Sequence, residues 1–189
     1  DPSTLTGAQP LAAGRALFER VWGAPLPETK GLRLLDMMDG AVAGSFKGLW
    51  AIGYDILLTN PNAAETHRAL ASLDLLVVQD MFLNETARAY AHVFLPACSS
   101  FEKDGTFMNA ERCIQRVRQA LRPLGQSKPD WEIICAVAKA VGKGDGFDFG
   151  GPEAIWNEVR AGWPEGRGMS YARLEREGLR WPCPTEDHP

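Results

Sequence analysis

The chain has 189 residues, of which 45% are hydrophobic and 23% are charged, and 20 basic side chains stand against 24 acidic ones. A chain of this length can bury about 70% of its extended surface, and its composition excludes the disordered and collagen-like classes. The net charge of −4 gives no reason to expect nucleic-acid binding, and no run of 18 apolar residues predicts a membrane span.

Three short apolar runs predict β-strands, at residues 49–53, 73–80 and 92–96. The second run is almost entirely apolar, which is typical of a strand that is covered on both faces. The first four residues (DPST) contain neither a methionine nor a basic segment, so we expect no signal peptide and regard the chain as an excerpt.

Helical patterns separate these strands. Apolar residues recur at helical spacing over residues 32–42, before the first strand. Asn60 is the predicted N-cap, and Pro61 the first residue, of a helix that extends through Leu70. Asn84 is the predicted N-cap of a short helix that leads into the third strand. This alternation predicts a doubly wound α/β fold, with a mainly parallel sheet and helices on both faces.

The pattern changes after residue 96. Residues 105–117 are predicted to be extended. An amphipathic helix is predicted to follow Asp130 and to stop at Gly142, and Pro152 is predicted to open another helix. Ser170 is the predicted cap of a last short helix, which precedes an extended C-terminal arm. The predicted divisions are an N-terminal lead-in segment (1–30), a doubly wound domain (31–142) and a helical and extended return segment (143–189).

Polar side chains follow each predicted strand. Asp55 follows the first strand, Gln79 and Asp80 end the second, and Lys103 lies in the loop after the third. In an open parallel sheet, ligands bind beyond the carboxyl ends of the strands. A carboxylate there can accept hydrogen bonds from N1–H and the amino group of guanine, while a lysine supplies a charge for a phosphate. The pattern therefore favours a guanine nucleotide across the strand ends.

Each candidate also has a structural alternative, which the pattern leaves open. Asp80 can start a turn or cap the following helix, and Lys103 can be a solvated turn residue. Asp130, at the start of a predicted helix, can be a helix cap or can contribute to a ligand site. Residues 101–128 hold six basic and three acidic side chains, which predicts either a solvated arm or a wall facing an anion.

Familiar catalytic and metal-binding motifs are absent from the sequence. It contains no glycine-rich dinucleotide fingerprint, no phosphate loop and no serine nucleophile elbow. The four cysteines are 15, 22 and 48 residues apart and the three histidines are dispersed, so no metal site is expected.

Residues 73–118 resemble the large (alpha) subunit of molybdenum formate dehydrogenases. The pattern Val-Phe-Leu-Pro, Glu-Lys-Asp-Gly-Thr-Phe and Asn-Ala-Glu-Arg is that of the wider molybdopterin oxidoreductase family. The chain departs from the family after Gly53, where it has Tyr54-Asp55-Ile56 instead of the usual Glu-Asn-Pro or Glu-Asp-Pro. Further matching blocks follow in the family's order at residues 128–134, 152–156 and 181–184, so the resemblance covers about residues 30–189.

The resemblance implies a Rossmann-like domain that grips the guanosine and diphosphate end of one of two molybdopterin guanine dinucleotides around molybdenum or tungsten. Carried over residue by residue, it assigns cofactor contacts to Asp55, Gln79, Asp80, Lys103 and Asp130. It implies a cytoplasmic parent enzyme that oxidises formate to carbon dioxide and passes electrons to partner subunits. The iron–sulfur cluster, the metal ligand and the catalytic residues would lie in segments outside this chain, so we expect the chain alone to be inactive.

Two other interpretations remain open at this point. The chain can derive from another molybdopterin oxidoreductase, such as a nitrate reductase. It can also be a non-catalytic scaffold that docks a partner through its tryptophans, for which core packing is the competing explanation. The tryptophans concerned are Trp131, Trp156, Trp163 and Trp181.

Overall fold

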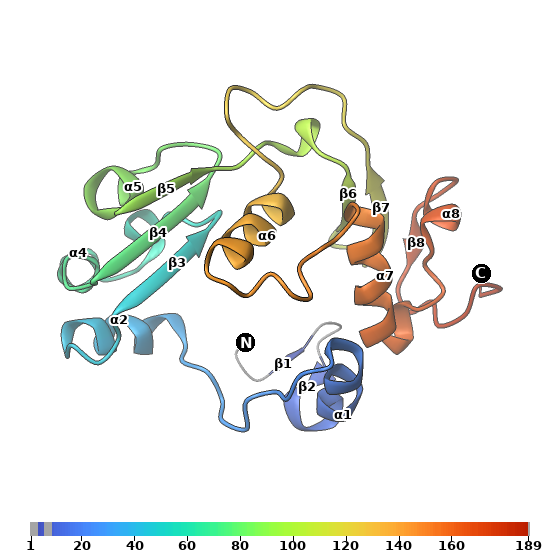
Figure 1. Cartoon of the computed structure of the whole chain (residues 1–189), viewed down its shortest axis with the longest axis horizontal. Coiled ribbons are helices and arrows are strands. Elements are labelled where there is room, and N and C mark those ends of the chain that lie inside the picture. Colours follow the sequence, from blue (N-terminus) through green and yellow to red (C-terminus); the bar gives the residue numbers. More distant parts are fainter. Residues whose placement is uncertain (1–3, 6–8, 189) are drawn as a thin grey trace. The chain divides into compact units, whose positions relative to one another are not determined.

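The computed structural model describes residues 4–5 and 9–188 and contains both helices and strands (Figure 1). Residues 31–99 and 123–133 form one unit, which we call the parallel unit. The residues up to 30 form the antiparallel unit together with 100–122 and 134–189. Within the described residues, no helix combines the length and the apolar composition needed to cross a bilayer.

A three-stranded parallel sheet forms the centre of the parallel unit. Its spatial order is β3 (Gly48–Ile52), β4 (Leu75–Asp80) and β5 (Val93–Pro96), the same as the order along the chain (Figure 1). Gly48 pairs with Leu75, and Val77 pairs with Val93. The predicted α/β class with a mainly parallel sheet is confirmed, and each strand lies within two residues of its prediction.

One predicted helix start is wrong. Asn62, not Asn60, is the N-cap of α4, and its Oδ1 accepts the backbone N–H of Glu65 at 3.2 Å. The Glu65 carboxylate in turn accepts from Asn62 Nδ2 at 2.7 Å, a pair that Asn60 cannot make because Ala63 stands three residues after it. The helices of this unit are α2 (Leu34–Val42), α3 (Ile56–Thr59), α4 (Ala63–Ala71) and α5 (Glu85–Tyr90).

The core of the parallel unit lies against one face of β4. Leu76 and Val78 have no exposed surface, and they belong to one cluster with Met38 and Leu70. The alternate residues of β4 are covered unevenly, because Leu75 is 47% exposed although Gln79 is fully buried. The expectation of a strand covered on both faces therefore holds for the carboxyl half of β4 and not for its first residue.

The antiparallel unit contains a second three-stranded sheet, in the order β6–β7–β8. The segment predicted to be extended forms a hairpin, in which Gly105 pairs with Val117. Ser170 precedes a short helix as predicted, but its hydroxyl donates to Glu186 Oε2 at 2.9 Å and makes no capping bond. The elements described here are β1 (Thr4–Leu5), β2 (Gln9–Pro10), α1 (Leu11–Trp22), β6 (Gly105–Met108), β7 (Cys113–Val117), α7 (Pro152–Gly162), α8 (Tyr171–Leu174) and β8 (Leu179–Arg180).

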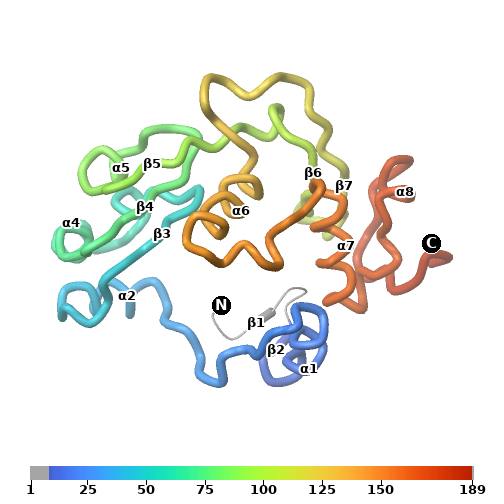
Figure 2. Tube along the Cα trace, viewed as in Figure 1, coloured from blue at the N-terminus to red at the C-terminus, as the bar shows by residue number. Residues whose placement is uncertain are grey.

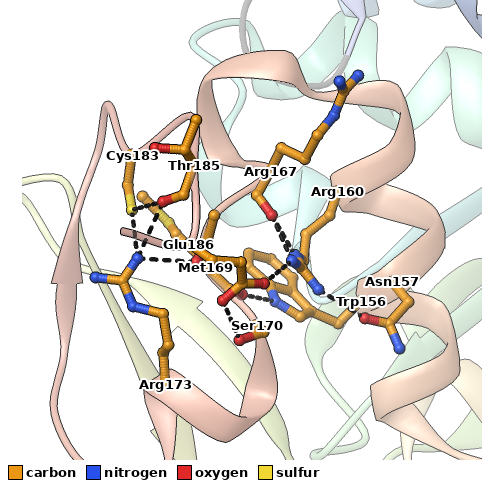
Figure 3. Close-up of polar contacts among 11 residues, drawn as sticks. Trp156, Asn157, Arg160, Arg167, Met169, Ser170, Arg173, Cys183, Thr185 and Glu186 are labelled. Carbon is orange, nitrogen blue, oxygen red and sulfur yellow. Dashed lines mark hydrogen bonds and ion pairs between the residues drawn. The ribbon is translucent and has the colours of Figure 1, made fainter. Parts of the chain in front are cut away.

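Trp156 and Trp163 belong to the core of the antiparallel unit. Trp156 is 8% exposed and Trp163 is 6% exposed, and both pack in one cluster with Met169 and Leu174. The indole N–H of Trp156 donates to the carbonyl of Met169 at 2.6 Å (Figure 3). The interpretation that Trp156 and Trp163 form a docking surface is therefore wrong, because both side chains pack in the core.

Two arginines hold the C-terminal segment of the antiparallel unit. Arg160 Nη2 donates to Glu186 at 2.8 Å, and Arg173 Nη1 donates to the carbonyl of Thr185 at 3.1 Å (Figure 3). A methyl group on Gly168 would overlap the Thr185 carbonyl, so the close approach of this segment requires glycine. Side-chain hydrogen bonds, in addition to its prolines, therefore fix the predicted extended arm.

The two units alternate along the chain, whereas we predicted three consecutive segments. Residues 100–122 belong to the antiparallel unit, and residues 123–133 return to the parallel unit (Figure 2). The return is anchored by a parallel bridge between Ala97 and Lys128. This return brings the start of α6 (Asp130–Ala140) into the parallel unit.

Candidate functional site

The carboxyl ends of β3, β4 and β5 share one edge of the parallel sheet. We call the residues at this edge the strand-end rim: 53–57, 79–86, 96–99 and 128–130. Backbone hydrogen bonds continue past the strands, from Gly53 N–H to the Gln79 carbonyl at 2.8 Å and from Ala97 N–H to the Asp80 carbonyl at 3.0 Å. The rim therefore has a defined backbone, on which the polar side chains are placed.

Gln79 and Asp130 form a buried pair at the rim. Gln79 Nε2 donates to Asp130 Oδ1 at 2.8 Å, and the Gln79 side chain has no exposed surface. The other amide atom, Gln79 Oε1, is buried and has no hydrogen-bond partner among the described residues. A buried acceptor without a donor costs about 1–3 kcal/mol, so this oxygen is a position at which a bound donor would be stabilising.

Asp130 is the first residue of α6 and not the residue before it. The backbone N–H of Ile133 donates to the Pro129 carbonyl at 3.2 Å, so the first turn of the helix closes on Pro129. The carboxylate of Asp130 thus stands at the beginning of a helix, where the backbone dipole favours negative charge.

Asp80 organises the turn that follows β4. Its Oδ1 accepts the N–H groups of Met81 at 2.7 Å and Phe82 at 3.4 Å, and its Oδ2 accepts Asn84 Nδ2 at 2.9 Å. A carboxylate offers about four acceptor positions, and only two of these three bonds are short, so acceptor capacity remains. The turn role that the sequence allowed is observed, and it leaves room for a ligand role.

Asp55 joins the loop after β3 to the start of α5. Its Oδ1 accepts the Thr86 hydroxyl at 2.6 Å, and its Oδ2 accepts the N–H of Glu85 at 3.2 Å. Burial acts to raise the pKa of Asp55, but the hydrogen bonds from Thr86, Glu85 and Leu58 outweigh it and hold the pKa below its ordinary value of 3.8. The structure thus gives this carboxylate a cap-like role toward two helices.

Asp55→Asn should lower the free energy of unfolding at pH 7 by about 1–2 kcal/mol, because an amide oxygen is a weaker acceptor for these donors than a carboxylate. The folded-state pKa is depressed, so the stabilisation is present above the ordinary pKa and is lost as pH falls through the folded-state value. Urea unfolding at several pH values should therefore show the difference between variant and wild type shrinking below about pH 4. A difference that stays constant down to pH 3 would contradict the assignment.

Lys103, the fifth predicted residue, belongs to the antiparallel unit and not to the rim. It is half-buried in the short loop between the single turn η2 (Ser100–Glu102) and β6. Of the five predicted residues, the structure brings four together in the parallel unit: Asp55, Gln79, Asp80 and Asp130.

Sequence reasoning missed Thr86 and one contact of Asn84, both of which organise the rim. Asn84 was predicted as a helix cap, and its Oδ1 does accept the N–H of Ala87 at 2.8 Å, but its second bond to Asp80 was not foreseen. Thr86 has no exposed surface, and its hydroxyl accepts the N–H of Leu57 at 3.0 Å. A threonine in a helical pattern gives no signal for such long-range contacts.

Three arginines of the basic residues at 101–128 make contacts within the antiparallel unit. Arg118 pairs with Glu175 at 3.1 Å, and Arg116 lies 3.7 Å from the same carboxylate. The Arg112 guanidinium lies over the Trp181 ring, 5.2 Å from its centroid. These arginines serve internal contacts, so a continuous anion-facing wall is not formed by them. In the described part of the chain, no three His, Cys, Asp or Glu side chains gather in a way that would hold a metal ion.

Comparison with known proteins gives consistent matches. The family described as molybdopterin oxidoreductase matches residues 6–140. The alpha subunit of an F420-dependent formate dehydrogenase from Methanocaldococcus jannaschii is 41% identical over 99% of this chain and 28% of its own length. The catalytic subunit of an assimilatory nitrate reductase from Bacillus subtilis is 42% identical over 93% of this chain and 26% of its own length.

A solved structure supports the fold. Acetylene hydratase from Pelobacter acetylenicus aligns with a TM-score of 0.67 over 95% of this chain and 25% of that protein, at 20% sequence identity. The chain thus spans about a quarter of the length of each of these relatives.

Proposed function

Because the chain belongs to the molybdopterin oxidoreductase family, we propose that it holds the guanosine and diphosphate end of one molybdopterin guanine dinucleotide in a formate dehydrogenase alpha subunit. The longer protein would oxidise formate, with its iron–sulfur cluster and its electron-transfer partners outside these residues. When bound, the molybdenum–pterin centre supplies the two-electron chemistry, and the residues of this chain only bind and orient.

The polar atoms of the strand-end rim fit a guanine. Guanine presents N1–H and an amino group side by side, so it needs acceptors. The Asp80 carboxylate offers its remaining acceptor capacity to both of these donors. Gln79 directly precedes Asp80 in β4, so its side chain lies on the other face of the sheet, where its Oε1 is buried and unpartnered among the described residues. The remaining acceptor capacity of Asp80 at the end of β4 is the observation that supports the proposal most strongly, because a single carboxylate can accept from both guanine donors.

Asp130 completes the rim, and Lys103, which lies in the antiparallel unit, is a separate prediction from the sequence. Asp130 keeps the Gln79 amide oriented, since it accepts the Nε2 hydrogen and leaves Oε1 for another donor. Lys103 is proposed to contribute positive charge toward the diphosphate, as a mobile ammonium suited to phosphate oxygens.

A nitrate reductase parent is the second candidate, because the nitrate reductase relative is as similar to this chain as the formate dehydrogenase relative. Both candidate parents need the same binding site for the nucleotide part of the cofactor, so the strand-end rim does not distinguish a nitrate reductase from a formate dehydrogenase. The metal-ligating and substrate-orienting segments of the longer protein would decide between the two.

The 189-residue chain should bind GDP at least about tenfold more tightly than ADP, because adenine presents an acceptor at N1 where guanine presents a donor. Isothermal titration with each nucleotide measures this ratio. Lys103→Ala is the matched control, since losing a phosphate contact should weaken both nucleotides equally and leave the ratio unchanged. Equal affinities for GDP and ADP in the wild-type chain would refute the proposed guanine site.

A further inference from the structure

We infer that Thr86 is a positioning residue of the strand-end rim, which acts through Asp55 and Asn84 to fix the carboxylate of Asp80. The inference rests on the proposed function, and it adds a residue that no ligand would touch. The Thr86 side chain has no exposed surface, so any effect on a nucleotide must pass through its neighbours.

The hydroxyl of Thr86 connects two loops that are distant in sequence. It accepts the Leu57 N–H at 3.0 Å, and it donates to Asp55 Oδ1 at 2.6 Å. One buried oxygen thus ties the loop after β3 to the first turn of α5. Both of its hydrogen bonds join residues about 30 positions apart, so neither is replaced by local structure.

The Asp55 carboxylate also accepts hydrogen bonds from the backbone of α5. Asp55 Oδ2 accepts the Glu85 N–H at 3.2 Å, and Oδ1 accepts the Thr86 N–H at 3.4 Å. The start of α5 is therefore held against the loop after β3 by contacts with both oxygens of one carboxylate.

Asn84 connects the start of α5 to the Asp80 carboxylate. It stands directly before Glu85, its Oδ1 caps α5, and its Nδ2 donates to Asp80 Oδ2 at 2.9 Å. A shift in the start of α5 would move this donor and with it the carboxylate that we propose reads guanine. Thr86 is thus linked to the Asp80 carboxylate through its bond to Asp55, the backbone of residues 84–86 and the bond from Asn84 to Asp80.

Thr86→Val removes the hydroxyl and keeps the shape, so it breaks the link without opening a cavity. It should reduce the ratio of GDP to ADP affinity about tenfold, roughly what the loss of one well-oriented hydrogen bond costs. Thr86→Ser keeps the hydroxyl and should retain the wild-type ratio. Thr66→Val is the matched control, because Thr66 is also buried (2% exposed) but its hydroxyl bonds only locally, to the Asn62 carbonyl at 2.8 Å.

Amide hydrogen exchange supplies a readout that needs no nucleotide. Thr86→Val should speed exchange at Leu57 and also at Met81 and Phe82, whose N–H groups bond to Asp80. Thr66→Val should leave Met81 and Phe82 unchanged. If Thr86→Val fails to fold, Asp55→Ala removes the acceptors of the same link from its more exposed side and is measured in its place.

The possible outcomes separate the two proposals. A wild-type chain that does not distinguish GDP from ADP removes the proposed function, and exchange at Met81 and Phe82 then decides the positioning role alone. A selective wild type whose Thr86→Val variant keeps the full ratio, or unchanged exchange at Met81 and Phe82, overturns the positioning role and leaves the guanine site standing.

Discussion

Asp80→Asn is expected to weaken GDP binding by about 10- to 100-fold, the range associated with one bidentate contact to a base. The introduced amide has one acceptor where guanine requires two. Xanthine carries a carbonyl in place of the guanine amino group, so the amide can accept from N1–H and donate to that carbonyl. The variant should therefore bind xanthosine diphosphate more tightly than wild type does, which titration calorimetry measures directly.

Asp74→Asn is the matched control for this exchange of specificity. Asp74 stands directly before β4 and Asp80 ends it, so both substitutions remove one negative charge from the same strand at opposite ends. The control should leave both affinities unchanged. If Asp80→Asn loses GDP without gaining xanthosine diphosphate, the residue acts through its turn with Met81 and Asn84 and does not read the base.

Leu76→Ala is expected to have the largest effect on stability, about 2–5 kcal/mol in the free energy of unfolding. Leu76 lies in the central strand of the parallel sheet and has no exposed surface. Leu75→Ala is the matched control one position away, where the side chain is 47% exposed, and it should cost less than about 1 kcal/mol. Urea unfolding followed by circular dichroism measures both variants.

Comparing the stability losses of Leu76→Ala and Leu75→Ala also tests the register of β4. Successive side chains of a strand point to opposite faces, so a shift of one residue would exchange the two environments. Equal losses for the two variants, or a larger loss for Leu75→Ala, would contradict the register in which Gly48 pairs with Leu75.

The strands could be predicted from the sequence because their signals are local. An apolar, β-branched run such as that of β4 has few alternatives to a buried strand. The short helix α3 was missed, since its four residues are too few for a periodic pattern. It is stabilised by the cap at Asp55 and by the burial of Ile56, and both depend on tertiary structure.

The candidate site was predictable in part. The rule that ligands bind at the carboxyl ends of parallel strands brought Asp80 and Gln79 to one edge. The contact between Gln79 and Asp130 joins residues 51 positions apart in sequence. It depends on the return of the chain beside β5, which local sequence patterns do not predict. The neutralisation of Arg118 by Glu175, 57 residues away, was hidden for the same reason.

The most direct measurement is a nitrogen–proton correlation spectrum of the labelled chain during titration with GDP. The central claim is that the acceptors at the end of β4 receive the guanine edge. The backbone signals of Met81 and Phe82 and the side-chain amide signals of Gln79 and Asn84 should shift with GDP and stay in place with ADP. Shifts confined to other parts of the molecule, with these four residues unmoved, would show that the strand-end rim does not hold the nucleotide.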